Sequence, residues 1–214
     1  MIAIINYGIG NLGSIRNMIE HVGGDAVITD SMETLREAKA LILPGVGAFD
    51  ACVAALRDSG LLGLIERRVH AEGVPLLGIC VGLQLMANRS EEGRESGLGW
   101  IAGEVERLRP HPEAKLKVPH LGWRSVEVGS ARGWAGVDDR PRFYFAHSYH
   151  FVPSDKEVIV GTVDYGGSVV AAVSQRNILA VQFHPEKSHK FGFQFFRQYL
   201  KELEAPSNER WRKG

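Results

Sequence analysis

The residue best placed to do chemistry is Cys80, which stands between two glycines in the motif Gly-x-Cys-x-Gly. The apolar run at 75–79 lacks alternation, which is typical of a buried central strand, and residues 83–87 favour a helix. A reactive side chain flanked by glycines between a strand and a helix is the nucleophile-elbow arrangement, here with cysteine in place of serine. The helix N-terminus behind the cysteine favours a thiolate and can stabilise an oxyanion. The alternative interpretation is a buried structural cysteine on a glycine-rich turn.

A histidine that could serve Cys80 as a base lies about a hundred residues later. His184 follows the last apolar strand of the chain, and Pro185 and Glu186 come directly after it. Because residues two apart in an extended segment face the same side, Glu186 can hydrogen-bond the far nitrogen of His184. Cys80, His184 and Glu186 would then act as nucleophile, base and orienting group, as in a catalytic triad.

A second glycine-rich segment, Pro-Gly-Val-Gly at 44–47, ends the strand predicted at 40–43. Its backbone N–H groups could face a ligand or change orientation. The alternative is a simple strand-to-helix turn. The other cysteine, Cys52, lies among small apolar residues of the predicted helix at 49–57, and we interpret it as inert packing.

Near the N-terminus, Gly8, Gly10 and Gly13 match Gly-x-Gly-x-x-Gly after the strand at 2–6. Asp30 ends a second strand, so the dinucleotide-binding fingerprint is complete. One hypothesis is therefore a nucleotide-dependent oxidoreductase. The alternatives are a tightly packed turn and a loop that faces a partner.

Later parts of the chain predict antiparallel strands. A strand-like pattern at 98–128 follows a polar loop or lid at 89–97, and the strand at 142–152 bends around His147 and Ser148. After a loop at 130–141, segments 158–163, 168–174 and 178–183 predict a meander, and a helix from Ser188 ends at Pro206. His147 and His150 lack a carboxylate or thiol at ligand spacing, so we expect no metal. The whole pattern predicts one α/β domain with a central, largely parallel sheet flanked by helices, plus antiparallel later strands.

Composition and charge give no support to several classes of function, although a local basic patch stays possible. Lys and Arg together number 25, as do Asp and Glu, so overall charge does not favour nucleic acid or an anionic membrane. Two cysteines in different contexts favour a reducing compartment over a disulfide framework. Residues 1–6 lack the basic region and the apolar length of a signal peptide, and no stretch reaches the ~18 apolar residues of a membrane span. We expect a cytoplasmic protein.

Taken together, the motifs resemble those of a known family. Gly-Ile-Cys-Val-Gly-Leu-Gln at 78–84 and Phe-His-Pro-Glu at 183–186 are similar to class I (triad) glutamine amidotransferases. Within that family, further segments resemble the glutaminase subunits of imidazole glycerol phosphate synthase in histidine biosynthesis: 6–11, 44–47, 118–123, 145–149 and 186–188. The resemblance spans nearly the whole chain. It implies a flavodoxin-like core, an amidotransferase domain at 1–205 and a polar tail at 206–214.

The resemblance also implies a role for each matching residue. Cys80 would attack the side-chain amide of L-glutamine, His184 would protonate the leaving ammonia and activate water, and Glu186 would hold the imidazole. The N–H of Val81 and, after an inward flip, that of Val46 would form the oxyanion hole. The full set implied for substrate and oxyanion is Gly45, Val46, Gly47, Val81, Gln84, Ser148 and Tyr149. No cofactor is implied.

Ammonia formed by such a subunit would be delivered to a partner, a (β/α)8-barrel cyclase subunit that binds the phosphorylated acceptor. The partner surface implied by the resemblance comprises Asn11, His120, Trp123, Tyr144 and Lys187. Arg124 stands where the family usually has Asn, which leaves open a similar partner in surface-sugar amidation. A non-catalytic binding protein of the same fold is a further hypothesis, and an unreactive Cys80 would favour it.

Overall fold

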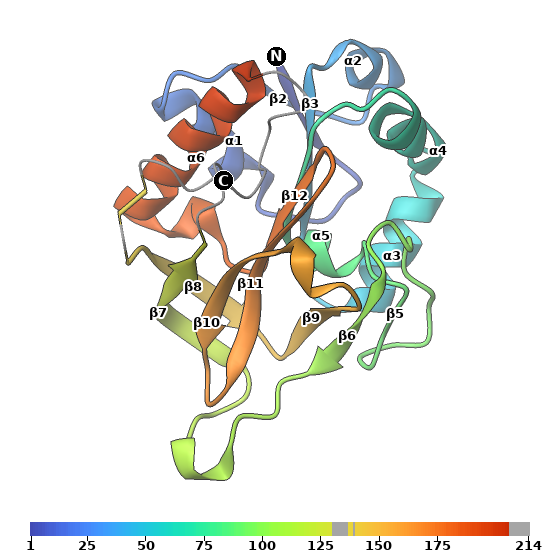
Figure 1. Ribbon diagram of the computed structural model, residues 1–214. Helices are drawn as coiled ribbons and strands as arrows, with labels where there is room; N and C mark the ends of the chain where they lie inside the picture. Colours follow the sequence, from blue (N-terminus) through green and yellow to red (C-terminus); the bar gives the residue numbers. More distant parts are fainter. Residues whose placement is uncertain (130–136, 139, 206–214) are drawn as a thin grey trace.

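The computed structural model describes residues 1–129, 137–138 and 140–205 (Figure 1). The strands are β1 (Ile2–Ile5), β2 (Ala26–Thr29), β3 (Ala40–Gly45), β4 (Leu76–Cys80), β5 (Arg89–Ser90), β6 (Gly103–Arg107), β7 (His120–Val128), β8 (Arg142–His147), β9 (Tyr149–Pro153), β10 (Ile159–Asp164), β11 (Ser168–Gln175) and β12 (Ile178–Val181). The α-helices are α1 (Leu12–His21), α2 (Met32–Glu37), α3 (Phe49–Asp58), α4 (Leu62–Glu66), α5 (Val81–Gln84) and α6 (His189–Glu204). Shorter turns are the π-helix η1 (Arg67–Ala71) and the 3₁₀ helices η2 (Pro112–Ala114), η4 (Lys156–Val158) and η5 (Pro185–Lys187). None of the helices in the described part of the chain is long and apolar enough to cross a membrane.

The central sheet has the strand order β2-β1-β3-β4-β12-β11-β10-β7-β8. Pairs from β2 to β12 are parallel, and pairs from β12 to β8 are antiparallel. Strand β12 therefore joins the two halves, since it runs parallel to β4 on one edge and antiparallel to β11 on the other. The predicted fold class is confirmed.

Helices cover both faces of the parallel half. Helices α1 and α6 pack together on one face, and α2, α3 and α4 lie on the other (Figure 1). A smaller sheet, β5-β6-β9, extends away from the antiparallel half. Because helices cover both faces of β4, all five of its residues are buried, which explains its unbroken apolar sequence.

Several predicted elements differ from the observed ones. The strand predicted to bend at 147–148 is two strands in different sheets, β8 and β9. The pattern at 98–128 contains the strands β6 and β7 with the 3₁₀ helix η2 between them, and the helix after the elbow lasts one turn. The meander is confirmed at β10, β11 and β12. Most of the loop at 130–141, together with Pro206 and the tail at 206–214, lies outside the described residues.

The polar stretch at 89–97 docks on the N-terminus of α3. The carboxylate of Asp50 accepts the backbone N–H groups of Arg94 and Glu95, at 2.9–3.1 Å, and Glu92 accepts the N–H of Phe49 at 2.9 Å. Carboxylates at the start of a helix satisfy otherwise unpaired N–H groups and oppose the helix dipole. The predicted loop is therefore tied to the body of the domain.

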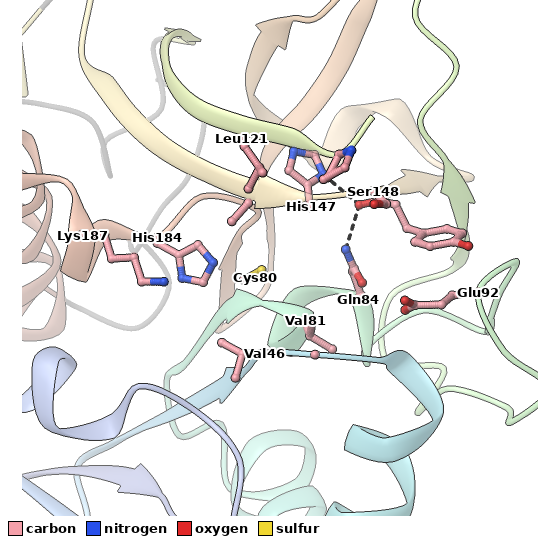
Figure 2. A pocket seen from close by; sticks show the side chains of 14 residues that line it. Val46, Cys80, Val81, Gln84, Glu92, Leu121, His147, Ser148, His184 and Lys187 are labelled. Carbon is pink, nitrogen blue, oxygen red and sulfur yellow. Dashed lines mark hydrogen bonds between the residues drawn. The ribbon is translucent and has the colours of Figure 1, made fainter. Parts of the chain in front are cut away.

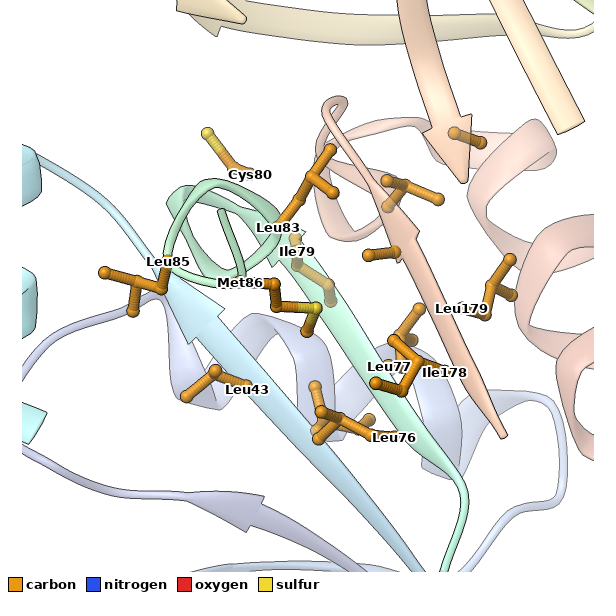
Figure 3. Packing of buried hydrophobic residues seen from close by; sticks show 14 of the residues in the cluster. Leu43, Leu76, Leu77, Ile79, Cys80, Leu83, Leu85, Met86, Ile178 and Leu179 are labelled. Carbon is orange, nitrogen blue, oxygen red and sulfur yellow. The ribbon is translucent and has the colours of Figure 1, made fainter. Parts of the chain in front are cut away.

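At its carboxyl end, β4 lies beside β3 and the short helix α5. Figure 3 shows Leu76, Leu77 and Ile79 packed among residues of β3 and β12, while Cys80 points away from this cluster at the strand's end. Gly82 passes so close to β3 that a Cβ built on it would lie 2.0 Å from the carbonyl oxygen of Leu43. The elbow therefore depends on a residue without a side chain at position 82.

Replacing Gly82 by alanine tests this packing. We expect Gly82→Ala to lower the free energy of unfolding by about 1–3 kcal/mol, because strand or helix must move to admit the methyl group. The control is Gly13→Ala in α1, where a Cβ meets nothing within 4 Å. This change should be neutral or stabilising by up to ~1 kcal/mol. Chemical denaturation of both variants measures the difference, and equal stabilities would contradict the close approach.

Candidate active site

Cys80 occupies a strained backbone conformation at the strand-to-helix turn. Its φ of 55° and ψ of −111° lie in a region that residues with a side chain rarely adopt, and it precedes the first residue of α5. Such strain costs on the order of 1–3 kcal/mol and concentrates at functional sites. The side chain is 3% exposed. The predicted elbow is therefore present, with the thiol at the head of a helix.

His184 and Glu186 form a buried pair beside this thiol. His184 Nδ1 lies 2.8 Å from Glu186 Oε1, and the two side chains are 3% and 1% exposed. The predicted contact is confirmed, but the extended segment predicted to produce it is wrong, because Pro185 begins the 3₁₀ turn η5. Glu186 Oε2 has no hydrogen-bond partner among the described residues. Glu186 is therefore dedicated to His184.

Charge on the neighbours holds a proton on His184. Burial alone would lower the pKa of His184, but hydrogen bonds and charge interactions with Cys80 and Glu186 outweigh it and raise the pKa to about 10. At neutral pH the ring is thus an imidazolium between two groups that can be anionic. Figure 2 shows the ring next to Cys80. The protonated ring can therefore act as an acid beside the sulfur.

Cys80 and His184 border a cavity of about 320 Å³. Its lining residues are Val46, Gly47, Cys80, Val81, Gln84, Glu92, Pro119, Leu121, Ala146, His147, Ser148, Tyr149, His184 and Lys187. Of the residues predicted for the site, only Gly45 and Glu186 do not line it; both are buried, and each is followed in the sequence by a residue that does. Glu92, Pro119, Leu121, Ala146 and His147 also line the cavity, although they were not predicted as substrate or oxyanion residues.

Side chains fix the backbone on either side of the Gly45–Val46 peptide. The hydroxyl of Tyr7 donates to the carbonyl of Pro44 at 2.6 Å, and the thiol of Cys52 donates to the carbonyl of Val46 at 3.4 Å. Burial raises the pKa of both groups, so each keeps the proton that it donates. Cys52 is buried as predicted, but it also holds the segment at 44–47.

Gln84 is tied to two neighbours through its amide nitrogen. Nε2 donates to the carbonyl of Tyr149 at 2.9 Å and to Oε1 of Gln182 at 3.0 Å (Figure 2 shows the first bond). Gln182 Nε2 lies 3.7 Å from the sulfur of Cys80. Gln182 was missed in the sequence, although a polar residue at the end of an apolar strand, two positions before His184, was a usable signal.

A pair of buried histidines supports the wall of the cavity. His147 Nδ1 lies 2.8 Å from the carbonyl of Tyr149 and must donate to it, so Nε2 of His147 accepts from Nδ1 of His120 at 3.1 Å. Burial lowers the pKa of His147 to about 3 and that of His120 to about 4, so both rings are neutral at pH 7. No cluster of three or more His, Cys, Asp or Glu suited to a metal occurs in the part of the chain that the structure describes.

The residues predicted for the partner surface do not all lie on the surface. His120 is 1% exposed, stacked between Phe145 and Tyr165 at centroid distances of 4.6 and 3.9 Å, so its assignment to a surface is wrong. Trp123 and Tyr144 contact each other, and the amine of Lys187 lies over the ring of Tyr144. Asn11 is the half-buried N-cap residue of α1.

Exposed apolar surface borders the cavity along β7, near Trp123. Leu121 is 64% exposed and lines the cavity, and Trp123 stacks on His189 at a centroid distance of 5.4 Å. Arg124 is exposed and its guanidinium lies 5.6 Å from the centre of the Tyr165 ring. Aromatic and apolar side chains next to a cavity mouth are typical of a protein-binding surface.

The glycine loop at 8–13 has a packing explanation that needs no nucleotide. A Cβ on Gly10 would lie 3.1 Å from the ring carbons of Pro44 and 2.9 Å from Leu12. The loop therefore packs against the end of β3, beside the segment that Tyr7 and Cys52 hold.

Comparison with known proteins agrees with this arrangement. The model of the family described as Glutamine amidotransferase class-I matches residues 3–201. The chain belongs to the class-I glutamine amidotransferase family.

Among its relatives are subunits named imidazole glycerol phosphate synthase subunit HisH 2. The one from Pseudomonas aeruginosa is 44% identical over 201 residues, covering 94% of this chain and 98% of the relative. The one from Methanococcus maripaludis is 45% identical over 203 residues, covering 94% of this chain and 100% of the relative. A solved structure titled as a glutamine amidotransferase has the same fold, with a TM-score of 0.74 at 22% identity over 95% of this chain and 99% of that one.

The neutral histidine pair predicts a loss of stability in acid. The pKa of His120 is about 4 in the folded chain against 6.5 unfolded, so the unfolded state binds the proton first and stability falls as pH drops from about 6.5 to 4. At pH 5 this costs about 2 kcal/mol relative to pH 7.5. His120→Phe keeps the stacked ring but removes the group whose protonation in the unfolded state causes this loss of stability. It should therefore lose about 2 kcal/mol less than the wild type between pH 7.5 and 5.

Denaturation curves at both pH values measure this difference. At pH 7.5 the variant should itself be less stable by about 1–3 kcal/mol, because Nε2 of His147 loses its donor. His111→Gln, at a side chain that is 67% exposed, is the control and should follow the wild type. An acid-induced loss in His120→Phe as large as that of the wild type would contradict the buried neutral pair.

Proposed function

We propose that this chain is the glutaminase subunit of imidazole glycerol phosphate synthase, which hydrolyses glutamine and passes ammonia to a cyclase subunit. One observation supports the glutaminase activity above all. In a chain of the class-I amidotransferase family, Cys80 and His184 are buried side by side at one cavity, and Glu186 contacts His184 from behind. Identity of 44–45% to subunits named HisH, over nearly their whole length, supports the place in histidine biosynthesis.

The geometry supports a two-step reaction. The Cys80 thiolate attacks the carboxamide carbon of glutamine, and the C–N bond breaks as the His184 imidazolium gives its proton to the departing nitrogen. The product is a γ-glutamyl thioester and ammonia. Neutral His184 then takes a proton from water, the resulting hydroxide attacks the thioester, and the C–S bond breaks to restore the thiolate. Glu186 holds the ring in one orientation throughout.

The oxyanion formed in each step needs donors at the head of α5. The N–H of Val81 belongs to the first residue of that helix, beside Cys80. The N–H of Val46 has no hydrogen-bond partner in the described part of the chain, and rotation of the Gly45–Val46 peptide would turn it toward the cavity. One oxyanion donor is worth a factor of about 100–1000 in rate. That rotation would therefore suffice to switch the glutaminase on.

Ammonia released into water is protonated and loses its nucleophilicity, so delivery requires a covered path. The apolar and aromatic surface around Leu121 and Trp123 lies where a partner would cover the mouth of the cavity. We assign this surface to the partner, together with Tyr144, Lys187 and Asn11. A (β/α)8-barrel architecture for the partner and a cytoplasmic location remain predictions from the resemblance.

Removing the thiol tests the glutaminase chemistry. Cys80→Ser should lower glutamate release by about 1000-fold or more, because the hydroxyl is a far weaker nucleophile at neutral pH. The assay measures glutamate from glutamine in the presence of a cyclase subunit and its phosphorylated ribonucleotide acceptor. An unchanged unfolding midpoint establishes that the variant is folded. Retained hydrolysis would remove Cys80 from the mechanism.

Stimulation by the partner tests the place in the pathway. The wild-type chain alone should hydrolyse glutamine slowly, and addition of the acceptor-loaded cyclase should raise the rate about 100-fold or more, as expected for one added oxyanion donor. Trp123→Ala should weaken binding of the cyclase about 10-fold or more and leave the unstimulated rate unchanged.

Met32→Ala on α2, where the side chain is 44% exposed, is the matched control and should leave cyclase binding unchanged. Full activity without a partner would contradict the switch. Stimulation by a different synthase alone would reassign the acceptor, as Arg124 allows, and leave the glutaminase chemistry in place.

A further inference from the structure

We propose that Gln182 is a positioning residue of the site that donates a hydrogen bond to the Cys80 sulfur and fixes the orientation of the Gln84 amide. This inference deepens the proposed glutaminase function and rests on Cys80 as its nucleophile. Gln182 is 0% exposed and does not line the cavity, so it acts only through these two neighbours.

Strand register brings Gln182 level with Cys80. Val181 of β12 is the parallel partner of Ile79 of β4, so the next residue on each strand is Gln182 and Cys80. The backbone N–H of Gln182 donates to the carbonyl of Ala171 at 2.8 Å, which fixes its main chain at the end of the sheet. The side chain thus starts from a rigid position.

The directions of both amides follow from one carbonyl group. Tyr149 O can only accept, so the Gln84 atom at 2.9 Å from it is the nitrogen. That nitrogen also lies 3.0 Å from the Gln182 amide, whose facing atom must therefore be the oxygen. The Gln182 nitrogen is then the atom 3.7 Å from the sulfur. His147 donates to the same Tyr149 carbonyl, which reinforces the order of the network.

Two consequences for the reaction follow from this order. An N–H donor at the sulfur stabilises the thiolate relative to the thiol, in addition to the imidazolium on the other side. Both hydrogens of the Gln84 amide are used, and its Oε1 has no partner among the described residues. Gln84 therefore presents an acceptor to the cavity, suited to an N–H group of the substrate such as the α-ammonium of glutamine.

The pH dependence of Cys80 alkylation tests the donor without any need for glutaminase activity. The full-length chain is treated with iodoacetamide between pH 5 and 10, and modification of the Cys80 peptide is followed by mass spectrometry. In Gln182→Met, which keeps the length of the side chain but has no donor, the midpoint should rise by about one pH unit. Alkylation at pH values below the midpoint should be about tenfold slower.

A second substitution of Gln182 and a control substitution elsewhere separate the loss of the donor from a general effect on folding. Gln182→Asn keeps an amide that is one methylene too short to reach the sulfur, and it should also raise the midpoint. Gln198→Leu in α6 removes another buried glutamine, 7% exposed, and should leave the midpoint of Cys80 unchanged. In a folded variant of Gln182, the KM for glutamine should also rise about tenfold, since Gln84 loses a partner that orients it.

The outcomes separate this inference from the proposed function. A wild-type midpoint in either folded Gln182 variant would overturn the role of Gln182, whatever the glutaminase assay shows. A raised midpoint in a chain that does not hydrolyse glutamine, with or without partner, would support the hydrogen bond to sulfur and overturn the proposed function.

Discussion

The parallel pairing of β3, β4 and β12 is the constraint on which the site depends. Gly45 is level with Cys80, and Val181 is level with Ile79, so three strands end at the same height. Parallel strands present their carboxyl ends at one edge of a sheet, where helices begin and ligands bind. The edge therefore gathers the segment at 44–47, the thiol and His184 from positions that lie far apart in the chain. A shift of one residue in either pairing would separate them.

Electrostatics at this edge depend on burial. His184 stays protonated because the thiol and Glu186 face it inside the protein, where charge interactions are weakly screened. Close by, burial without a carboxylate keeps His120 and His147 neutral. Histidines within one small region thus hold opposite charge states. The charged ring can transfer protons, and the neutral pair acts as a fixed donor and acceptor that supports Tyr149.

Local motifs predicted the geometry of the turn at Cys80 and of the His184–Glu186 pair, whereas contacts between distant segments could not be predicted. Cys80 and the His184–Glu186 contact could be predicted, because each depends on neighbours in sequence. The contact between Gln182 and the thiol could not be predicted, since it depends on the register of strands about a hundred residues apart. His120 was assigned to the surface because its stacking partners come from β8 and from the β10–β11 turn. The break between β8 and β9 likewise depends on which sheet each half joins.

The two side chains that hold the segment at 44–47 act on different peptide groups. Tyr7 binds the carbonyl before the Gly45–Val46 peptide, and Cys52 binds the carbonyl after it. With both flanks held, the proposed rotation would turn this one peptide about the line between its Cα atoms while those atoms stay in place. Two states of the subunit would then have superimposable Cα traces and differ in the direction of one amide dipole. Such a difference would be visible to isotope-edited amide spectroscopy and invisible to a comparison of backbone traces.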